Sequence, residues 1–167
     1  PISDGLSLKG IELAGKYLRR AYDDGKDMEA REGMAAAALM GGMAFANSGL
    51  GAAHGVGMAV GIQYGVPHGE ACGIMLPHVM KLNMRVGEAL TGKRFASDEE
   101  AAQAAVDFIF DLTAHMNIKP DFKHLNIPEE AIHGLTMASF GTSMSSNPRR
   151  FDKEHPEELE AFIRTIV

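Results

Sequence analysis

The sequence contains one cysteine and no tryptophan, and only 7% of its 167 residues are aromatic. A single thiol, Cys72, excludes an internal disulfide and favours a reducing, cytoplasmic location. The sequence contains 11 Met, 19 Gly and many alanines, a composition typical of closely packed helices. Strands are instead enriched in β-branched and aromatic residues. We therefore predict an all-α protein.

No run of 18 uncharged apolar residues is present, because the most apolar stretch, 34–66, contains His54 together with Gly, Asn and Gln residues. We expect neither a transmembrane segment nor a signal peptide. Basic residues are in the minority, 16 against 22 acidic ones, for a formal net charge of −6. This balance disfavours binding to nucleic acid or to an anionic membrane surface.

Hydrophobic residues make up 46% of the sequence and recur at helical spacing, which predicts one compact bundle of about seven helices over residues 1–167. The body of the second helix is apolar on all sides, so we expect that helix to be central. Pro77 is expected to kink or divide the fourth helix, and 141–152 to form an extended loop. The expected helices span residues 2–23, 28–46, 50–64, 68–90, 97–116, 128–138 and 156–166.

Two of the seven histidines lie beside backbone that can approach a neighbour closely. His54 lies in a segment with glycines at 51, 55, 57 and 61, and His68 follows Pro67. A shared site would need His54 on a helix and His68 on the loop returning over it. Two imidazoles suit iron or zinc, but a catalytic metal needs at least three protein ligands, so the pattern predicts an incomplete metal site.

Other chemistry-bearing patterns are weaker. The sequence has no nucleophile elbow, Cys-x-x-Cys pair or Walker loop, and its Gly-x-Gly at 55–57 has no preceding strand. We assign no residue as a general acid or base. Cys72, four residues after His68, is interpreted as a small buried apolar side chain, with an oxidation-sensitive thiol near the metal site as the alternative. Residues 143–150 are expected to form a surface loop, or alternatively a pocket mouth that includes Asn147.

Several segments together resemble the C-terminal helical domain of the iron-containing alcohol dehydrogenase family. They are Gly-Met-Ala-Phe-Ala-Asn-Ser-Gly-Leu-Gly-Ala-Ala-His at 42–54, Pro-His-Gly at 67–69, Leu-Pro-His-Val-Met-Lys-Leu-Asn at 76–83, Gly-Thr at 141–142 and Asn-Pro-Arg at 147–149. The resemblance covers essentially the whole chain.

This resemblance implies a two-domain enzyme whose N-terminal α/β domain, not present in this chain, binds NAD or NADP. In the family an Asp and a His, four residues apart just upstream of the matched region, hold the metal with two later histidines that match His54 and His68. The implied metal is Fe²⁺, with Zn²⁺ as the alternative. The implied reaction is hydride transfer between a small alcohol or aldehyde and the nicotinamide. Because the sequence lacks an initiator Met, we expect an inactive part of a longer protein, and the resemblance implies that this protein is a homo-oligomer.

Three further residues match family positions around the cofactor and the substrate. Phe45 and Ser143 match positions that line the substrate pocket, although a core aromatic is an equal interpretation of Phe45. Met58 matches a position near the nicotinamide where many relatives carry a proton-relaying His. Methionine cannot transfer a proton, so this member would need another route.

Two other function classes stay open at this point. One is a stand-alone helical module that binds a ligand or partner through its Met-rich and Gly-rich surface, without redox chemistry. The other is a metal-dependent lyase or dehydratase on a related scaffold. The sequence does not distinguish NAD from NADP and does not name the alcohol.

Overall fold

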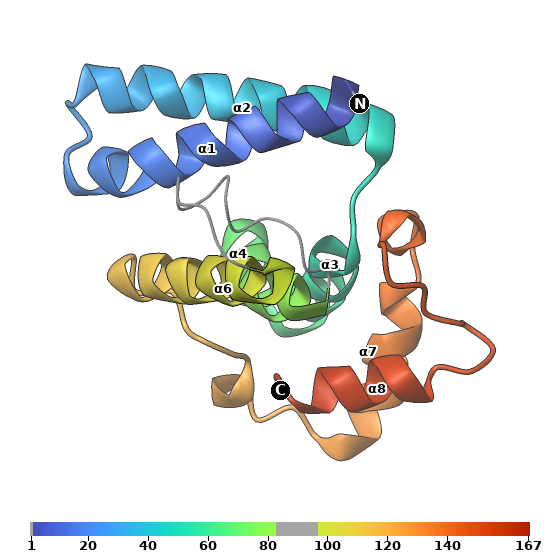
Figure 1. The fold of residues 1–167 in the computed structure, drawn as a ribbon. Helices are drawn as coiled ribbons and strands as arrows, with labels where there is room; N and C mark the ends of the chain where they lie inside the picture. Colours follow the sequence, from blue (N-terminus) through green and yellow to red (C-terminus); the bar gives the residue numbers. More distant parts are fainter. Residues whose placement is uncertain (1, 83–96) are drawn as a thin grey trace. The chain divides into compact units, whose positions relative to one another are not determined.

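The computed structural model describes residues 2–82 and 97–167, and the regular structure in these two stretches is entirely helical (Figure 1). The predicted all-α class is therefore confirmed. The predicted bounds agree closely, and the predicted extension of the fourth helix toward residue 90 lies outside the described residues. The helices are α1 (Ile2–Asp23), α2 (Met28–Ser48), α3 (Ala52–Tyr64), α4 (His68–Leu82), α6 (Asp98–His115), α7 (Ile132–Ser139) and α8 (Glu157–Arg164).

The chain divides into two compact units, 1–49 with 84–116, and 50–83 with 117–167. The first unit contains α1, α2 and α6, and the second contains α3, α4, α7 and α8. A single domain over the whole chain stays a prediction. In the described residues, no helix is both long enough and apolar enough to cross a membrane.

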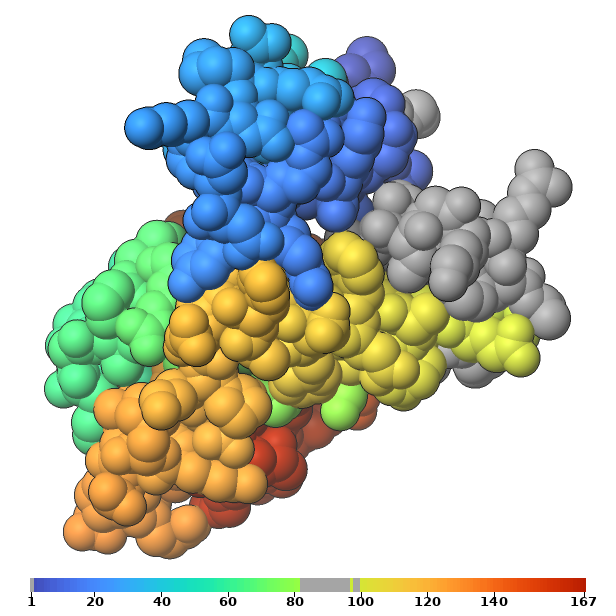
Figure 2. Space-filling model, turned by 90° about the vertical axis from the view of Figure 1, so that its left-hand side faces the viewer, coloured from blue at the N-terminus to red at the C-terminus, as the bar shows by residue number. Residues whose placement is uncertain are grey.

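In the first unit, α1 and α2 form a hairpin whose atoms, coloured blue in Figure 2, pack closely together. Small residues permit this approach: a Cβ added at Gly10 would lie 3.4 Å from the Ala37 carbonyl oxygen. The prediction that α2 is central was wrong. It buries Ala30, Ala37 and Ala44, at a spacing of seven residues, whereas Leu39 is 65% exposed. Among the described residues, α1 covers one stripe of this apolar helix rather than its whole circumference.

Asp27 ends the turn between α1 and α2 and caps α2. Its carboxylate accepts a hydrogen bond from the Ala30 N–H at 3.1 Å and from Arg20 Nε at 2.9 Å. The backbone N–H of Ala30, followed by the Arg20 guanidinium, holds the pKa of Asp27 below its ordinary value. Asp27 therefore stabilises the hairpin above its unfolded-state pKa, and this contribution is lost as the pH falls through the lower folded-state pKa.

This linkage predicts how Asp27→Asn behaves with pH. Asparagine keeps the capping oxygen but loses the charge that attracts Arg20, so the variant should melt below the wild type near neutral pH. The gap should stay constant above about pH 5 and shrink only as the pH falls below about 4, the ordinary Asp pKa, because the wild-type carboxylate is protonated there. Thermal melts followed by circular dichroism at several pH values test this. Asp24→Asn, in the same turn but outside the Arg20 cluster, is the control, and a gap independent of pH would contradict the prediction.

In the second unit, α3 lies at the centre of a continuous apolar core formed with α4, α7 and α8. Pro77 lies inside α4 without dividing it. The predicted loop at 141–152 contains one 3₁₀ turn, Met144–Ser146, whose Met144 side chain packs against the core. The fully buried core residues include Val56, Val60, Ile74, Met75, Phe122, Ile132, Leu135, Leu159 and Ile163.

Candidate metal centre

A buried amide fixes the start of α3 and therefore the position of His54. Asn147 is 1% exposed, and its side-chain oxygen accepts the Ala52 N–H at 3.1 Å, while its amide nitrogen donates to the Arg149 carbonyl at 2.7 Å. The cap satisfies one of the free N–H groups at the helix start. His54 thereby lies in the first turn of α3.

Glycines on α3 allow α4 to approach closely. A Cβ added at Gly57 would lie 3.4 Å from the Ala71 backbone, and one added at Gly61 would lie 3.0 Å from the Val66 carbonyl oxygen. The sequence prediction that this glycine-dense segment permits close backbone approach is thus confirmed. The close packing of α3 and α4 sets the two histidines near each other.

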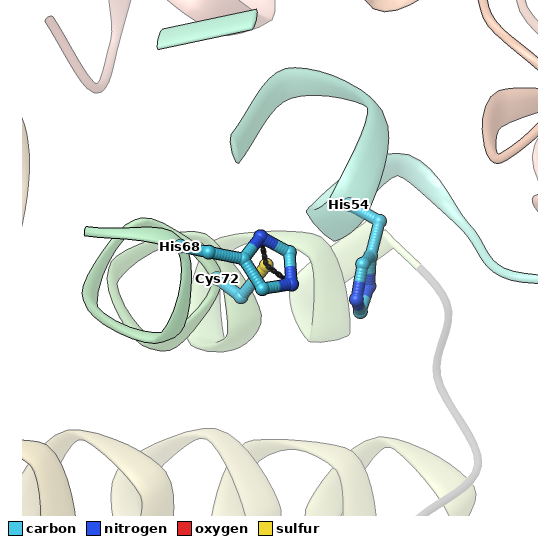
Figure 3. A group of neighbouring side chains, drawn as sticks. All are labelled: His54, His68 and Cys72. Carbon is cyan, nitrogen blue, oxygen red and sulfur yellow. Dashed lines mark hydrogen bonds between the residues drawn. The ribbon is translucent and has the colours of Figure 1, made fainter. Parts of the chain in front are cut away.

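His54 and His68 face each other across this helix pair (Figure 3). Their ring centroids are 5.2 Å apart, with 55° between the ring planes. His68 is the first residue of α4, so it lies on a helix rather than on the loop that we expected. Cys72 follows one turn later, with its Sγ 3.7 Å from His68 Nδ1 and 3.8 Å from Nε2. Ligand atoms of all three residues lie within 4.8 Å of one another.

The surroundings of His54 favour a neutral ring. Partial burial lowers the pKa of His54, and the neighbouring His68 lowers it further. The His54 ring also lies in the first turn of α3, where the positive end of the helix dipole disfavours imidazolium. Burial raises the pKa of the Cys72 thiol. A neutral imidazole has a free lone pair, so His54 is available to bind a metal at neutral pH.

The spacing of these side chains fits a divalent cation. A tetrahedral zinc with Zn–N near 2.0 Å and Zn–S near 2.3 Å holds its donor atoms roughly 3.5 Å apart. The Cys72 sulfur lies almost equally far from both nitrogens of the His68 ring, only one of which can bind the ion, and His68 is exposed, which leaves its ring room to turn. The side chains of His54, His68 and Cys72 can therefore supply two nitrogens and one sulfur to one metal ion.

An open depression of about 180 Å³ borders His68. Its wall is mostly apolar, and Met58 contributes an exposed side chain to it, at 41% of its full area. The residues that line it are Gly57, Met58, Gly61, Ile62, Val66 and His68.

Phe45 belongs to the first unit and Ser143 to the second. Phe45 is half exposed on α2, so its alternative interpretation as a core aromatic was wrong. Ser143 precedes the 3₁₀ turn Met144–Ser146 in the second unit and is partly buried. The substrate-pocket roles of both residues stay predictions.

Sequence reasoning undervalued two residues of this region. Asn147 was considered for a pocket mouth, but its side chain caps α3 at Ala52, 95 residues earlier in the chain. No local sequence pattern predicts such a distant contact. Cys72 was interpreted as a buried apolar residue but is only partly buried and lies against His68. Its four-residue spacing from His68 was the available signal, because residues four apart share a helix face.

Comparisons with known proteins agree with this architecture. Residues 1–163 match the family described as Fe-containing alcohol dehydrogenase, C-terminal. Alcohol dehydrogenase 4 of Schizosaccharomyces pombe is 41% identical over 135 residues, which are 78% of this chain and 32% of that protein. A crystal structure of 1,3-propanediol oxidoreductase aligns with a TM-score of 0.89 at 30% identity, covering 99% of this chain and 45% of that one.

A sulfoacetaldehyde reductase from Bifidobacterium kashiwanohense, solved in complex with NAD⁺, aligns with a TM-score of 0.82 at 28% identity. That alignment covers 98% of this chain and 44% of the reductase. The chain therefore spans less than half the length of these relatives. Since the family match covers nearly all of its residues, the chain belongs to the Fe-containing alcohol dehydrogenase family.

Proposed function

We propose that this chain is the helical, metal-binding part of an NAD(P)-dependent alcohol dehydrogenase that interconverts a small alcohol and its aldehyde. The observation that carries the proposal is the pairing of His54 and His68, 5.2 Å apart on adjacent helices, in a member of this family. An N-terminal α/β domain outside this chain would bind most of the nucleotide. The NAD⁺ held by the related sulfoacetaldehyde reductase supports this cofactor class.

His54 and His68 would hold the divalent cation, with Fe²⁺ as the first candidate from the family and Zn²⁺ as the second. When bound, such an ion supplies Lewis-acid polarisation of the substrate oxygen. The His54 imidazole is suited to this task because its setting lowers its pKa and so favours the neutral ring. Anchoring on two packed helices keeps the His54 and His68 rings near each other before a ligand arrives.

The depression beside His68 would take the reacting groups. Its apolar wall, which includes Met58 and Ile62, favours an alkyl chain or the nicotinamide face over water. Among the six residues that line the depression, His68 is the one ionisable side chain. Met58 has no ionisable proton, so it offers no proton relay. We infer that the hydroxyl proton leaves through solvent. Phe45 and Ser143 would complete the substrate pocket, and Met58 would contact the nicotinamide.

The remaining parts of the proposal concern the whole protein. We propose a cytoplasmic homo-oligomer that acts on small molecules and binds neither nucleic acid nor membranes. The formal charge of −6 and the single cysteine support these assignments.

A direct assay tests the proposal in the full protein that carries this chain. We expect NADH or NADPH absorbance to appear with small primary alcohols and a divalent metal. His68→Ala should lower that rate by about 100-fold or more, because a metal ligand is lost. His155→Ala, an exposed histidine outside the cluster, is the control. An unchanged rate in His68→Ala would refute the metal role, and metal-dependent dehydration without nicotinamide reduction would favour the lyase.

A further inference from the structure

We propose that Asn147 is a positioning residue of the metal site, which acts on His54 through the backbone of α3 and thereby sets how tightly the site binds its metal. This inference rests on the proposed function and deepens it. Asn147 opens the Asn-Pro-Arg segment at 147–149, to which the proposed function gives no role. Its amide bonds backbone groups of α3 and of its own loop, the Ala52 N–H and the Arg149 carbonyl.

The first turn of α3 has no cap of its own. Gly51 occupies the N-cap position without a side chain to cap the helix, and Ala52 is fully buried, so water cannot readily replace a lost partner of the Ala52 N–H. The Asn147 amide oxygen supplies that partner from a side chain that is itself 1% exposed. Without it a buried donor is left unsatisfied, and the turn gains by opening toward water.

His54 belongs to this turn and moves with it. Its backbone N–H donates to the Gly51 carbonyl at 3.1 Å. At the next residue, a Cβ added at Gly55 would lie 3.1 Å from the methyl carbon of buried Met144, so α3 is tightly packed just beyond the histidine. Packing at Gly55 and the cap at Ala52 therefore hold the backbone on either side of His54. Of these two restraints, the cap depends on a single side-chain atom.

The Asn147 side chain is held in place by its neighbours. Pro148 restricts the residue before it to extended backbone, and Asn147 has a ψ of 132°. The amide nitrogen donates to the Arg149 carbonyl, and the Arg149 guanidinium pairs with Glu158 on α8. Both ends of the amide are thus engaged, which fixes the direction from which its oxygen reaches α3.

The glycine at position 51 leaves room for this distant cap. A Cβ added at Gly51 would lie 3.0 Å from the Asn147 Oδ1 atom, inside ordinary van der Waals contact. The backbone of Gly51 is extended, with a φ of −137° and a ψ of −166°, as in helices that a serine caps locally. A local cap at position 51 and the cap from Asn147 therefore exclude each other. This relation provides a test by exchange of one cap for the other.

The metal affinity of the full protein that carries this chain is the first measurement. Asn147→Ala should bind Zn²⁺ about tenfold more weakly than the wild type, because the metal binds only molecules whose His54 is in place and a helix cap is worth about that factor. Gly51→Ser alone should also weaken binding, since its Cβ displaces the amide. The double variant should recover most of the affinity, because the serine caps α3 where the amide oxygen is gone. A double variant no better than Asn147→Ala would overturn the inference.

Ile163→Val, in the core of the same unit, is the control for general destabilisation. Its side chain is fully buried, so the loss of one methylene should lower the urea midpoint about as much as the loss of a cap does. Its Zn²⁺ affinity, measured well below the midpoint, should equal that of the wild type. An equal loss of affinity in Ile163→Val and Asn147→Ala would make stability alone responsible and would overturn the inference.

Amide hydrogen exchange in the metal-free 167-residue chain gives a readout that needs no metal. Asn147→Ala should speed the exchange of the His54 amide about tenfold, whereas Ile163→Val should leave it unchanged, because a first helical turn exchanges by local fraying. Unchanged His54 exchange or unchanged Zn²⁺ affinity in Asn147→Ala would overturn the inference. Absence of Zn²⁺ binding by the wild-type full protein would refute the proposed metal site instead, and the His54 amide would then decide alone whether Asn147 positions this residue.

Discussion

His54→Ala is expected to lower the affinity of the chain for Zn²⁺ by about 100-fold or more. Mutation of residues that only hydrogen-bond to a metal ligand already lowers metal affinity by about 10–100-fold, and His54 is a candidate ligand itself. His54 is the one ligand candidate that α3 contributes to the cluster. Its removal leaves only donors on α4, so the cluster can no longer hold an ion between two helices. Competition with a chromophoric chelator measures this change.

The matched control is His155→Ala, which should bind Zn²⁺ as the wild type does. A second exchange, His54→Asp, introduces a carboxylate oxygen donor at the same place and should recover part of the lost affinity. Circular dichroism should show the same helix content in all variants, because the His54 side chain is only partly buried. Equal Zn²⁺ affinity in His54→Ala and His155→Ala would refute the role of His54.

The sequence located the two histidines because both stand in unusual local contexts. Glycine density around His54 predicted close helix packing, and Pro67 predicted a new element at His68. Cys72 was harder to interpret, since one thiol on an apolar helix is as consistent with burial as with ligation. Its spacing places it on the same face of α4 as His68, but its approach to His54 depends on how α3 packs against α4, which spacing along the chain does not encode.

The helices were predictable where local chemistry decides them. Asp27 caps α2, Ser97 caps α6, and Gly49 ends α2 with a φ of 76°. The burial of α2 was not predictable in the same way. An apolar face indicates that a helix tends to pack, but which face finds a partner depends on contacts far along the chain, such as that of Ala37 with Gly10.

Gly33→Ala should destabilise the α1–α2 hairpin by about 1–3 kcal/mol, the usual cost of overpacking a tight contact. A Cβ at this position would lie 2.2 Å from Cδ2 of Tyr17, whose ring covers the glycine and is 8% exposed. The ring would have to move, and its hydroxyl would lose the 3.0 Å hydrogen bond that it donates to Glu29. A lower urea midpoint, followed by circular dichroism, is the expected result.

The same helix offers the control that isolates packing from helix propensity. Gly41 also lies inside α2, but a Cβ there meets no atom within 4 Å, so Gly41→Ala should stabilise the chain by about 1 kcal/mol. The two substitutions are chemically identical and should change stability in opposite directions. If both raised the midpoint equally, Tyr17 would not be packed against Gly33, and the close approach of α1 and α2 would need another cause.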